Sequence, residues 1–229
     1  MTTGRMLGLI VGLALSGAAS GALVFERKMA EVEADPGVDK LTVEFPFTVT
    51  GDKPVRIIEY EASCSCLEAK ISGGGKLVWK PGESGTVMGI FEMGTFKGTV
   101  EKPILLRVEG QPGPVRLSVR VHIPVLVEVD PVTLFWDQGG AGDSKVIKIK
   151  VNHEEPIHVT EVSGTNPQFS HELKKIRDGR EYELVVTPKT VERRAFGLLR
   201  IRTDSDYRRH QSYQAYVVVR RPKPDTGRG

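Results

Sequence analysis

The chain has 229 residues, of which 39% are hydrophobic and 27% are charged, and its 32 lysines and arginines against 29 aspartates and glutamates give a net charge of +3. This composition is typical of a folded protein and excludes a disordered or collagen-like chain. The small, dispersed charge provides no basic face, so no nucleic-acid partner is expected. The length suits one large domain or two small ones.

The N-terminus has a basic start followed by an apolar run. After Arg5, residues 6–25 carry no charge. Such a run is typical of an export signal or a membrane anchor, and Ser20-x-Ala22 matches the small-x-small cleavage pattern. About 20 apolar residues also suffice to cross a bilayer as a helix, so an uncleaved anchor is the alternative. We therefore expect residues 1–25 to be a signal peptide or anchor of an exported protein, periplasmic, extracellular or held at the membrane.

The body of the chain shows the alternation of strands. Residues 26–40 are polar and contain Pro36-Gly37, which predicts a linker. From Leu41 onward, apolar and polar residues alternate with period two, and clusters rich in Gly, Pro and Asp separate the segments. The predicted fold class is all-β, and short strands between such turns favour a sandwich.

The strand pattern occurs twice. Residues 45–63 align with residues 147–165, and "KLVWKPGE" (76–83) aligns with "ELVVTPKT" (183–190). Each copy is long enough to bury a core of its own, which indicates a domain duplication. We expect a first domain at 41–130, a second at 131–221 and a disordered tail at 222–229.

Four motifs of the first domain occur in a recognisable order: "FTVTGDKPVRI" (47–57), "SCSC" (63–66), "WKPGE" (79–83) and "FKG" (96–98). This order resembles the bacterial family called domain of unknown function 1573. The resemblance implies immunoglobulin-like domains related to the major sperm protein and pilus-chaperone folds, here in tandem, and an exported location. It implies no established activity. Ser65 and Leu67 stand where the family pattern has Gly and Thr.

Cys64 and Cys66 are the two cysteines of the chain. On a flat strand, residues two apart lie roughly 6.6 Å from each other, whereas a disulfide needs Cβ atoms about 4 Å apart, so a bond requires a bend. An oxidising compartment favours the bond. Two thiolates at this spacing can also bind Cu(I), whereas a zinc site needs four ligands. We rank a structural role, as packing or disulfide, above metal binding by Cys64 and Cys66.

Redox catalysis ranks last among the cysteine hypotheses. It requires a thiol of lowered pKa, which a neighbouring cation provides. Three glutamates flank the pair (Glu59, Glu61 and Glu68), and Lys70 is the one cation of that stretch.

Other polar motifs predict no enzyme and no cofactor. The chain lacks a phosphate-binding loop, a nucleophile elbow and a paired-histidine metal motif. We interpret "SGGGK" (72–76) as a flexible hairpin turn, and "HEE" (153–155) and "TDSDYRRH" (203–210) as solvated turns. The five histidines are expected to be exposed surface residues: His122, His153, His158, His171 and His210.

The sequence therefore favours a non-enzymatic binding or structural module of the cell envelope. Its expected partners are another envelope protein and, through the N-terminal segment, the membrane. The alternative hypothesis is a metal-handling protein that binds copper through Cys64 and Cys66.

Overall fold

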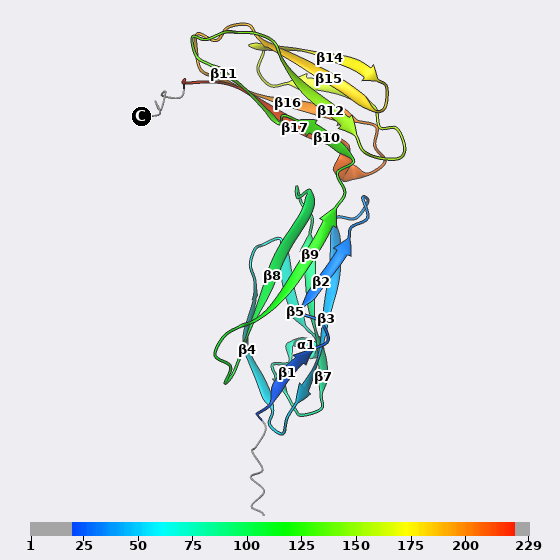
Figure 1. Cartoon of the computed structure of the whole chain (residues 1–229), viewed down its shortest axis with the longest axis vertical. Helices are drawn as coiled ribbons and strands as arrows, with labels where there is room; N and C mark the ends of the chain where they lie inside the picture. The colour runs from blue at the N-terminus through cyan, green and yellow to red at the C-terminus, as the bar shows by residue number, and fades with distance from the viewer. Residues whose placement is uncertain (1–19, 223–229) are drawn as a thin grey trace, which may run out of the picture. The chain divides into compact units, whose positions relative to one another are not determined.

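The computed structural model describes residues 20–222, and these are organised almost entirely as β-strands in four sheets (Figure 1). The predicted all-β fold class is confirmed. Contacts divide the chain into two compact units. Among the described residues, one comprises 20–30, Thr42–Phe91 and Lys102–Val119, and the other comprises Glu31–Leu41, Glu92–Glu101 and 120–222. No helix within the described span is long and apolar enough to cross a membrane.

Nine strands build the first pair of sheets. In spatial order, one sheet contains β1 (Ala22–Phe25), β3 (Lys40–Thr50), β7 (Ser84–Glu92) and β5 (Leu67–Ile71). The other contains β2 (Met29–Glu33), β9 (Val115–Ile123), β8 (Gly98–Val108), β4 (Val55–Ala62) and β6 (Val78–Trp79). Alternate side chains of the long strand β3 are buried, as the period of two predicts.

Eight strands build the second pair of sheets. One sheet has the order β10 (Val127–Asp130), β12 (Lys145–Val151), β15 (Glu181–Pro188), β14 (Phe169–Arg177). The other has the order β11 (Thr133–Asp137), β17 (Ser212–Arg220), β16 (Ala195–Thr203), β13 (Val159–Gly164). One buried cluster includes Ile147 and Leu184 from the first of these sheets and Leu199 and Val217 from the second. The two sheets therefore pack against each other in the manner of a sandwich.

The two pairs of sheets have the same strand order. The order β1-β3-β7-β5 corresponds to β10-β12-β15-β14, and β2-β9-β8-β4 corresponds to β11-β17-β16-β13. Only the short strand β6 has no counterpart among the described residues. The repeat of residues 45–63 at 147–165 is thus also a repeat of topology, and we call the two pairs the first and second sandwich. The predicted alignment of 76–83 with 183–190 is wrong, because residues 183–188 lie in β15, which corresponds to β7 and not to β6.

The predicted N-terminal boundaries are wrong. Ala22–Phe25, expected at the end of the signal or anchor, form β1 and pair antiparallel with β3. Met29–Glu33, expected in the linker 26–40, form β2. Both strands are too short to show a clear alternation of apolar and polar residues, because β1 lies in an apolar run and β2 in a polar one. The rest of the predicted signal or anchor, residues 1–19, lies outside the described residues.

The boundary between the two repeats also differs from the prediction. The alternating segment that ends at Val129 looked continuous, but it is divided into β9 and β10, and β10 belongs to the second sandwich. Pro124 falls in the interval and has no backbone N–H for a strand ladder. The second repeat therefore begins near residue 127 rather than 131. Of the predicted tail at 222–229, only Pro222 is among the described residues.

The glycine run is a turn, but it does not form a hairpin. It lies in α1 (Ser72–Gly75), a single turn in which Gly73 and Gly74 have positive φ. It connects β5 and β6, which belong to different sheets. Glycine is required because other residues rarely adopt this backbone conformation.

Candidate functional site

The histidines are less exposed than the sequence predicts. Three partly exposed histidines have polar partners: His122 contacts Glu31, His158 contacts Asp204 and His171 contacts the Val162 carbonyl. His210 contradicts the prediction outright, because its relative exposure is only 6%. It ends the segment 203–210, where Thr203 and Ser205 are also buried. The segment was predicted to be a solvated turn because its residues are polar, but it forms a partly buried turn between β16 and β17.

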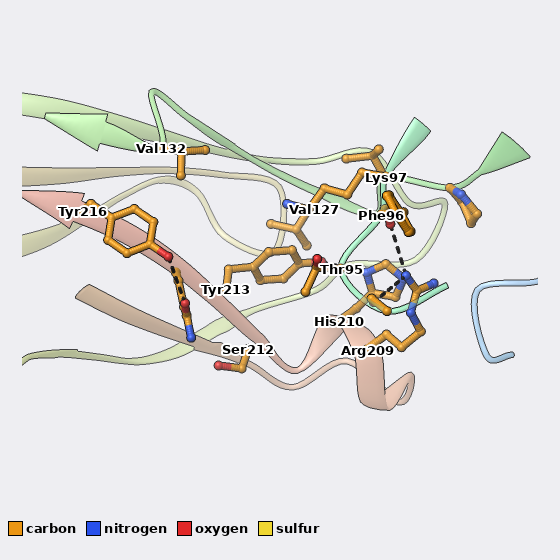
Figure 2. Close-up of a pocket in the computed structure, with 14 residues that line it drawn as sticks. Thr95, Phe96, Lys97, Val127, Val132, Arg209, His210, Ser212, Tyr213 and Tyr216 are labelled. Carbon is orange, nitrogen blue, oxygen red and sulfur yellow. Dashed lines mark hydrogen bonds between the residues drawn. The ribbon is translucent and has the colours of Figure 1, made fainter. Parts of the chain in front are cut away.

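His210 lines a cavity of about 440 Å³, and all the lining residues belong to the second compact unit (Figure 2). Its Nδ1 lies 2.8 Å from the Tyr213 hydroxyl. Burial, reinforced by the charges of Arg209 and Lys97, lowers the pKa of His210 to about 4. Burial raises the pKa of Tyr213. Both groups are therefore neutral at pH 7, and neither is poised to exchange a proton there.

The cations beside this cavity are engaged by the protein itself. Arg209 donates hydrogen bonds to the carbonyl oxygens of Gly94 and Phe96. The Lys97 ammonium lies 5.2 Å from the centre of the Tyr213 ring, a cation–π distance. The cavity thus contains a neutral His–Tyr pair and two cations that contact the protein, while the buried Nε2 of His210 and Nε of Arg209 have no hydrogen-bond partner.

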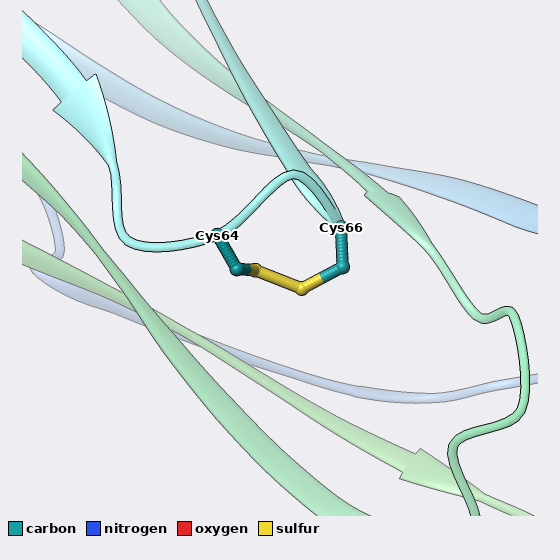
Figure 3. Close-up of a disulfide and its surroundings, with 2 residues drawn as sticks. All are labelled: Cys64 and Cys66. Carbon is teal, nitrogen blue, oxygen red and sulfur yellow. A yellow bond between two sulfur atoms is a disulfide. The ribbon is translucent and has the colours of Figure 1, made fainter.

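The second candidate site is the turn between β4 and β5, which contains Cys64 and Cys66 (Figure 3). The two sulfurs are bonded to each other, with a Cα–Cα distance of 5.2 Å. The bend that a disulfide requires is present, because the chain leaves one sheet at Ala62 and enters the other at Leu67.

Backbone hydrogen bonds hold this turn at both ends. The N–H of Ser63 donates to the carbonyl of Pro103 at 3.2 Å, and the N–H of Leu67 donates to the carbonyl of Cys64 at 3.2 Å. Leu67 is buried, Ser65 is exposed, and Cys64 and Cys66 are partly exposed. The disulfide therefore lies at the surface of a turn whose exit is anchored in the core.

The second sandwich builds the same turn without cysteine. The N–H of Thr165 donates to the carbonyl of Leu198 at 3.0 Å, and the N–H of Phe169 donates to the carbonyl of Asn166 at 3.1 Å. Asn166 stands at the position of Cys64 and Gln168 at that of Cys66. The Asn166 Oδ1 atom accepts a bond of 2.9 Å from the Gln168 N–H. A side-chain hydrogen bond thus spans the residues that the disulfide joins in the first sandwich.

The charges around the disulfide are partly balanced. Glu59 lies 3.7 Å from Arg107, and Glu68 lies 3.1 Å from Lys70. All four side chains are more than half exposed, so these pairs contribute little to stability. Arg107 is a neighbour that the sequence did not reveal, because it lies on β8, opposite Glu59 of β4.

No preformed metal site accompanies the cysteines. Their sulfurs are bonded to each other, so neither offers a thiolate in this state. Among residues 20–222, no group of three or more histidine, cysteine, aspartate and glutamate side chains is placed to hold a metal ion.

Comparison with known families covers the sandwich that carries this turn. Residues 23–123 match the family described as "Protein of unknown function (DUF1573)". The match begins in β1 and ends with β9, so the resemblance expected from the motifs is confirmed for the first sandwich. No curated protein matches the chain.

Several solved structures are similar to the chain at low identity. A protein of unknown function from Porphyromonas gingivalis W83 is 11% identical, with 88% of this chain and 99% of that chain covered and a TM-score of 0.31. The YadV chaperone is 8% identical over 86% and 99%, with a TM-score of 0.32. The secreted serine protease VesC from Vibrio cholerae is 12% identical over 74% and 47%, with a TM-score of 0.36. Similarities this weak indicate nothing about the function of this chain.

Proposed function

We propose that the chain is an exported, non-enzymatic module of the cell envelope, built from two tandem immunoglobulin-like domains, that binds another envelope protein along a strand edge. The repeated strand order supports the tandem arrangement.

The observation that carries the binding proposal is the edge strand β14. It has nine residues and is the last strand of its sheet. An edge strand offers backbone N–H and C=O groups to an added partner strand. The far half of β14 is basic and exposed, with Lys174, Lys175 and Arg177 around Ile176, whose exposure is 56%. Lys175 lies 3.4 Å from Asp178, and Arg177 lies 3.1 Å from Glu181, in exposed pairs that contribute little to stability. The charges protect the edge against indiscriminate pairing, and Lys174 favours a partner segment that is acidic.

Export is supported by the place where the folded body begins. Gly21 already lies against the backbone of Lys53, since a Cβ at Gly21 would stand 2.1 Å from that carbonyl oxygen. Together with β1, this leaves the 14 uncharged residues from Met6 to Ala19 ahead of the body. A run of this length suits the apolar part of a signal peptide.

Site-specific cross-linking tests the proposed edge. A photo-reactive side chain replaces Lys174 on β14 or, as the control, Lys148 on the interior strand β12, in the full chain expressed with its N-terminal segment. We expect one envelope protein to be cross-linked from position 174 and not from 148. The double substitution Lys174→Glu/Arg177→Glu should abolish this product, whereas Lys148→Glu/Lys150→Glu should leave it intact. Recovery of the uncross-linked chain alone from both positions would contradict the proposal.

A second candidate function is Cu(I) binding by the reduced cysteine pair. The single turn that presents Cys64 and Cys66 two residues apart favours it, because reduction would create two adjacent soft ligands. Copper analysis of the reduced protein, beside a Cys64→Ser/Cys66→Ser variant, tests this candidate. Equal copper content in the two proteins would end it.

A further inference from the structure

We propose that the Cys64–Cys66 disulfide is an exchange site that oxidises dithiols of other proteins. The inference does not depend on strand-edge binding, because the disulfide belongs to the first sandwich and β14 to the second, and because it concerns a separate reaction. It rests on three observations: the bond is not needed to form its turn, it lies at the surface, and the surrounding charge favours one class of substrate.

The first observation is that the second sandwich forms the corresponding turn without sulfur. The Leu67 to Cys64 hydrogen bond has its counterpart between Phe169 and Asn166, in a sandwich of the same strand order. There, an amide oxygen contacts the backbone of Gln168 in place of the cross-link. A bond that closes so short a loop and is not required for the local fold is free to be opened and closed.

The second observation is accessibility. Cys64 and Cys66 are partly exposed and are flanked by exposed Ser63 and Ser65. Leu67, which follows the turn, is buried and anchors it in the core. An incoming thiolate can therefore reach the bond without unfolding the sandwich, and exposed disulfides are the ones that exchange most readily.

The exchange proceeds in two balanced steps. A thiolate of the substrate attacks one sulfur of the pair, the Cys64–Cys66 bond breaks, and the other cysteine leaves as a thiolate that takes up a proton. The second thiol of the substrate loses its proton and attacks the mixed disulfide, which releases the first cysteine. The substrate dithiol gives up two electrons and two protons and becomes a disulfide, and Cys64 and Cys66 take them up and become two thiols.

The third observation concerns charge. Acidic neighbours raise the pKa of a thiol, so reduced Cys64 and Cys66 would be poor attacking nucleophiles, and redox catalysis was the least favoured of the cysteine hypotheses. In the structure, however, the cysteines form the bond that is attacked. Glu61 precedes the pair, and Glu59 and Glu68 have only exposed, weakly held partners. Arg107 and Lys70 balance two of these three carboxylates, so the excess is one negative charge. This small excess favours a substrate thiolate that is flanked by Lys or Arg over one that is flanked by Asp or Glu.

A pair of synthetic peptides tests the inference. Both contain two cysteines, flanked by lysines in one peptide and by glutamates in the other, and each is mixed with the oxidised full chain in the absence of air. We expect two thiols to be formed on the chain for each peptide disulfide, with the lysine peptide reacting at least about 10-fold faster at low salt. The Cys64→Asn/Cys66→Gln variant, which copies the second sandwich, should keep the circular dichroism spectrum and oxidise neither peptide. The Cys64→Ser/Cys66→Ser variant is the second control.

Two results would overturn the inference. If the native chain gains no thiols in an excess of either peptide, while the chain unfolded in guanidinium does, the disulfide is a buried structural bond. If both peptides react at the same rate, the acidic surroundings do not select the substrate. Neither result affects the cross-linking test of β14, so the two proposals can fail separately.

Discussion

The backbone N–H of Leu67 donates a hydrogen bond of 3.2 Å to the carbonyl oxygen of Cys64, across the turn that the disulfide closes. The same bond joins Phe169 to Asn166 at 3.1 Å in the second sandwich. Leu67 and Phe169 are both buried and both begin a strand. Burial of an apolar residue after the turn, together with this bond, thus sets the turn in both repeats.

Removal of the disulfide should therefore cost little stability. The chain-entropy model gives about 1.5 kcal/mol for a closed loop of three residues. We expect the Cys64→Asn/Cys66→Gln variant to lose no more than this in the free energy of unfolding by urea, and the reduced wild-type chain to behave alike. A loss of several kcal/mol, or failure of the variant to fold, would show that the bond is needed to form the first sandwich.

Gly85 is predicted to be intolerant of a side chain. A Cβ at Gly85 would lie 2.5 Å from the Trp79 ring and 2.6 Å from the Phe47 ring, and both rings are buried. The rings contact each other edge to face, with centroids 5.0 Å apart, so neither can shift freely. We expect Gly85→Ala to lower the free energy of unfolding by about 1–3 kcal/mol.

Gly113 supplies the control for Gly85. A Cβ at Gly113 would meet nothing within 4 Å, and its φ is not positive. Gly113→Ala should therefore change the free energy of unfolding by no more than about 0.5 kcal/mol. Equal effects of the two substitutions would contradict the packing described around Trp79.

His210 should make stability fall as the pH is lowered from 6.5 to about 4. Its pKa in the folded protein is about 4, against an ordinary value of 6.5, so the unfolded chain takes up a proton first. The free energy of unfolding should fall across this window by at most about 3 kcal/mol and then change no further from this group.

The His210→Asn variant isolates this effect, because its amide oxygen can face Tyr213 but does not titrate. Urea unfolding at pH 7, 5.5 and 4 should show a smaller loss for the variant than for the wild type. Parallel curves for the wild type and the variant would contradict the assignment to His210.

Asp204 affects stability at lower pH than His210 does. Burial opposes its ionisation, but hydrogen bonds from His158 hold the pKa of Asp204 below its usual value, so its contribution is lost only in stronger acid.

Arg180 should hold the turn at 153–155 in place. Its guanidinium donates hydrogen bonds to the carbonyl oxygens of His153, Glu154 and Glu155. We expect Arg180→Met to lower the free energy of unfolding by about 1–2 kcal/mol, because these carbonyls lose a charged donor. Arg180→Lys should recover only part of this, since one ammonium cannot replace the planar fork. Full stability of the methionine variant would mean that the turn holds itself.

The sequence predicted the all-β class and the duplication because both follow from periodicity, which burial on alternate faces enforces. It missed β1 and β2 because four or five residues within an apolar or a polar run give too little alternation to recognise. It predicted that Cys64 and Cys66 need a bend, since that is geometry. It misplaced His210 and missed Arg107, because which side chains are buried or face each other depends on strand register across the sheet.

The thiol state of the chain in its own compartment tests the account most directly. Cells that produce the full chain are treated with an alkylating reagent before lysis, and thiols and copper are then counted on the purified protein, with and without later reduction. The account predicts no free thiols before reduction, two after it, and no copper. Two free thiols before reduction, or stoichiometric copper, would contradict the disulfide as the state of this pair in the cell.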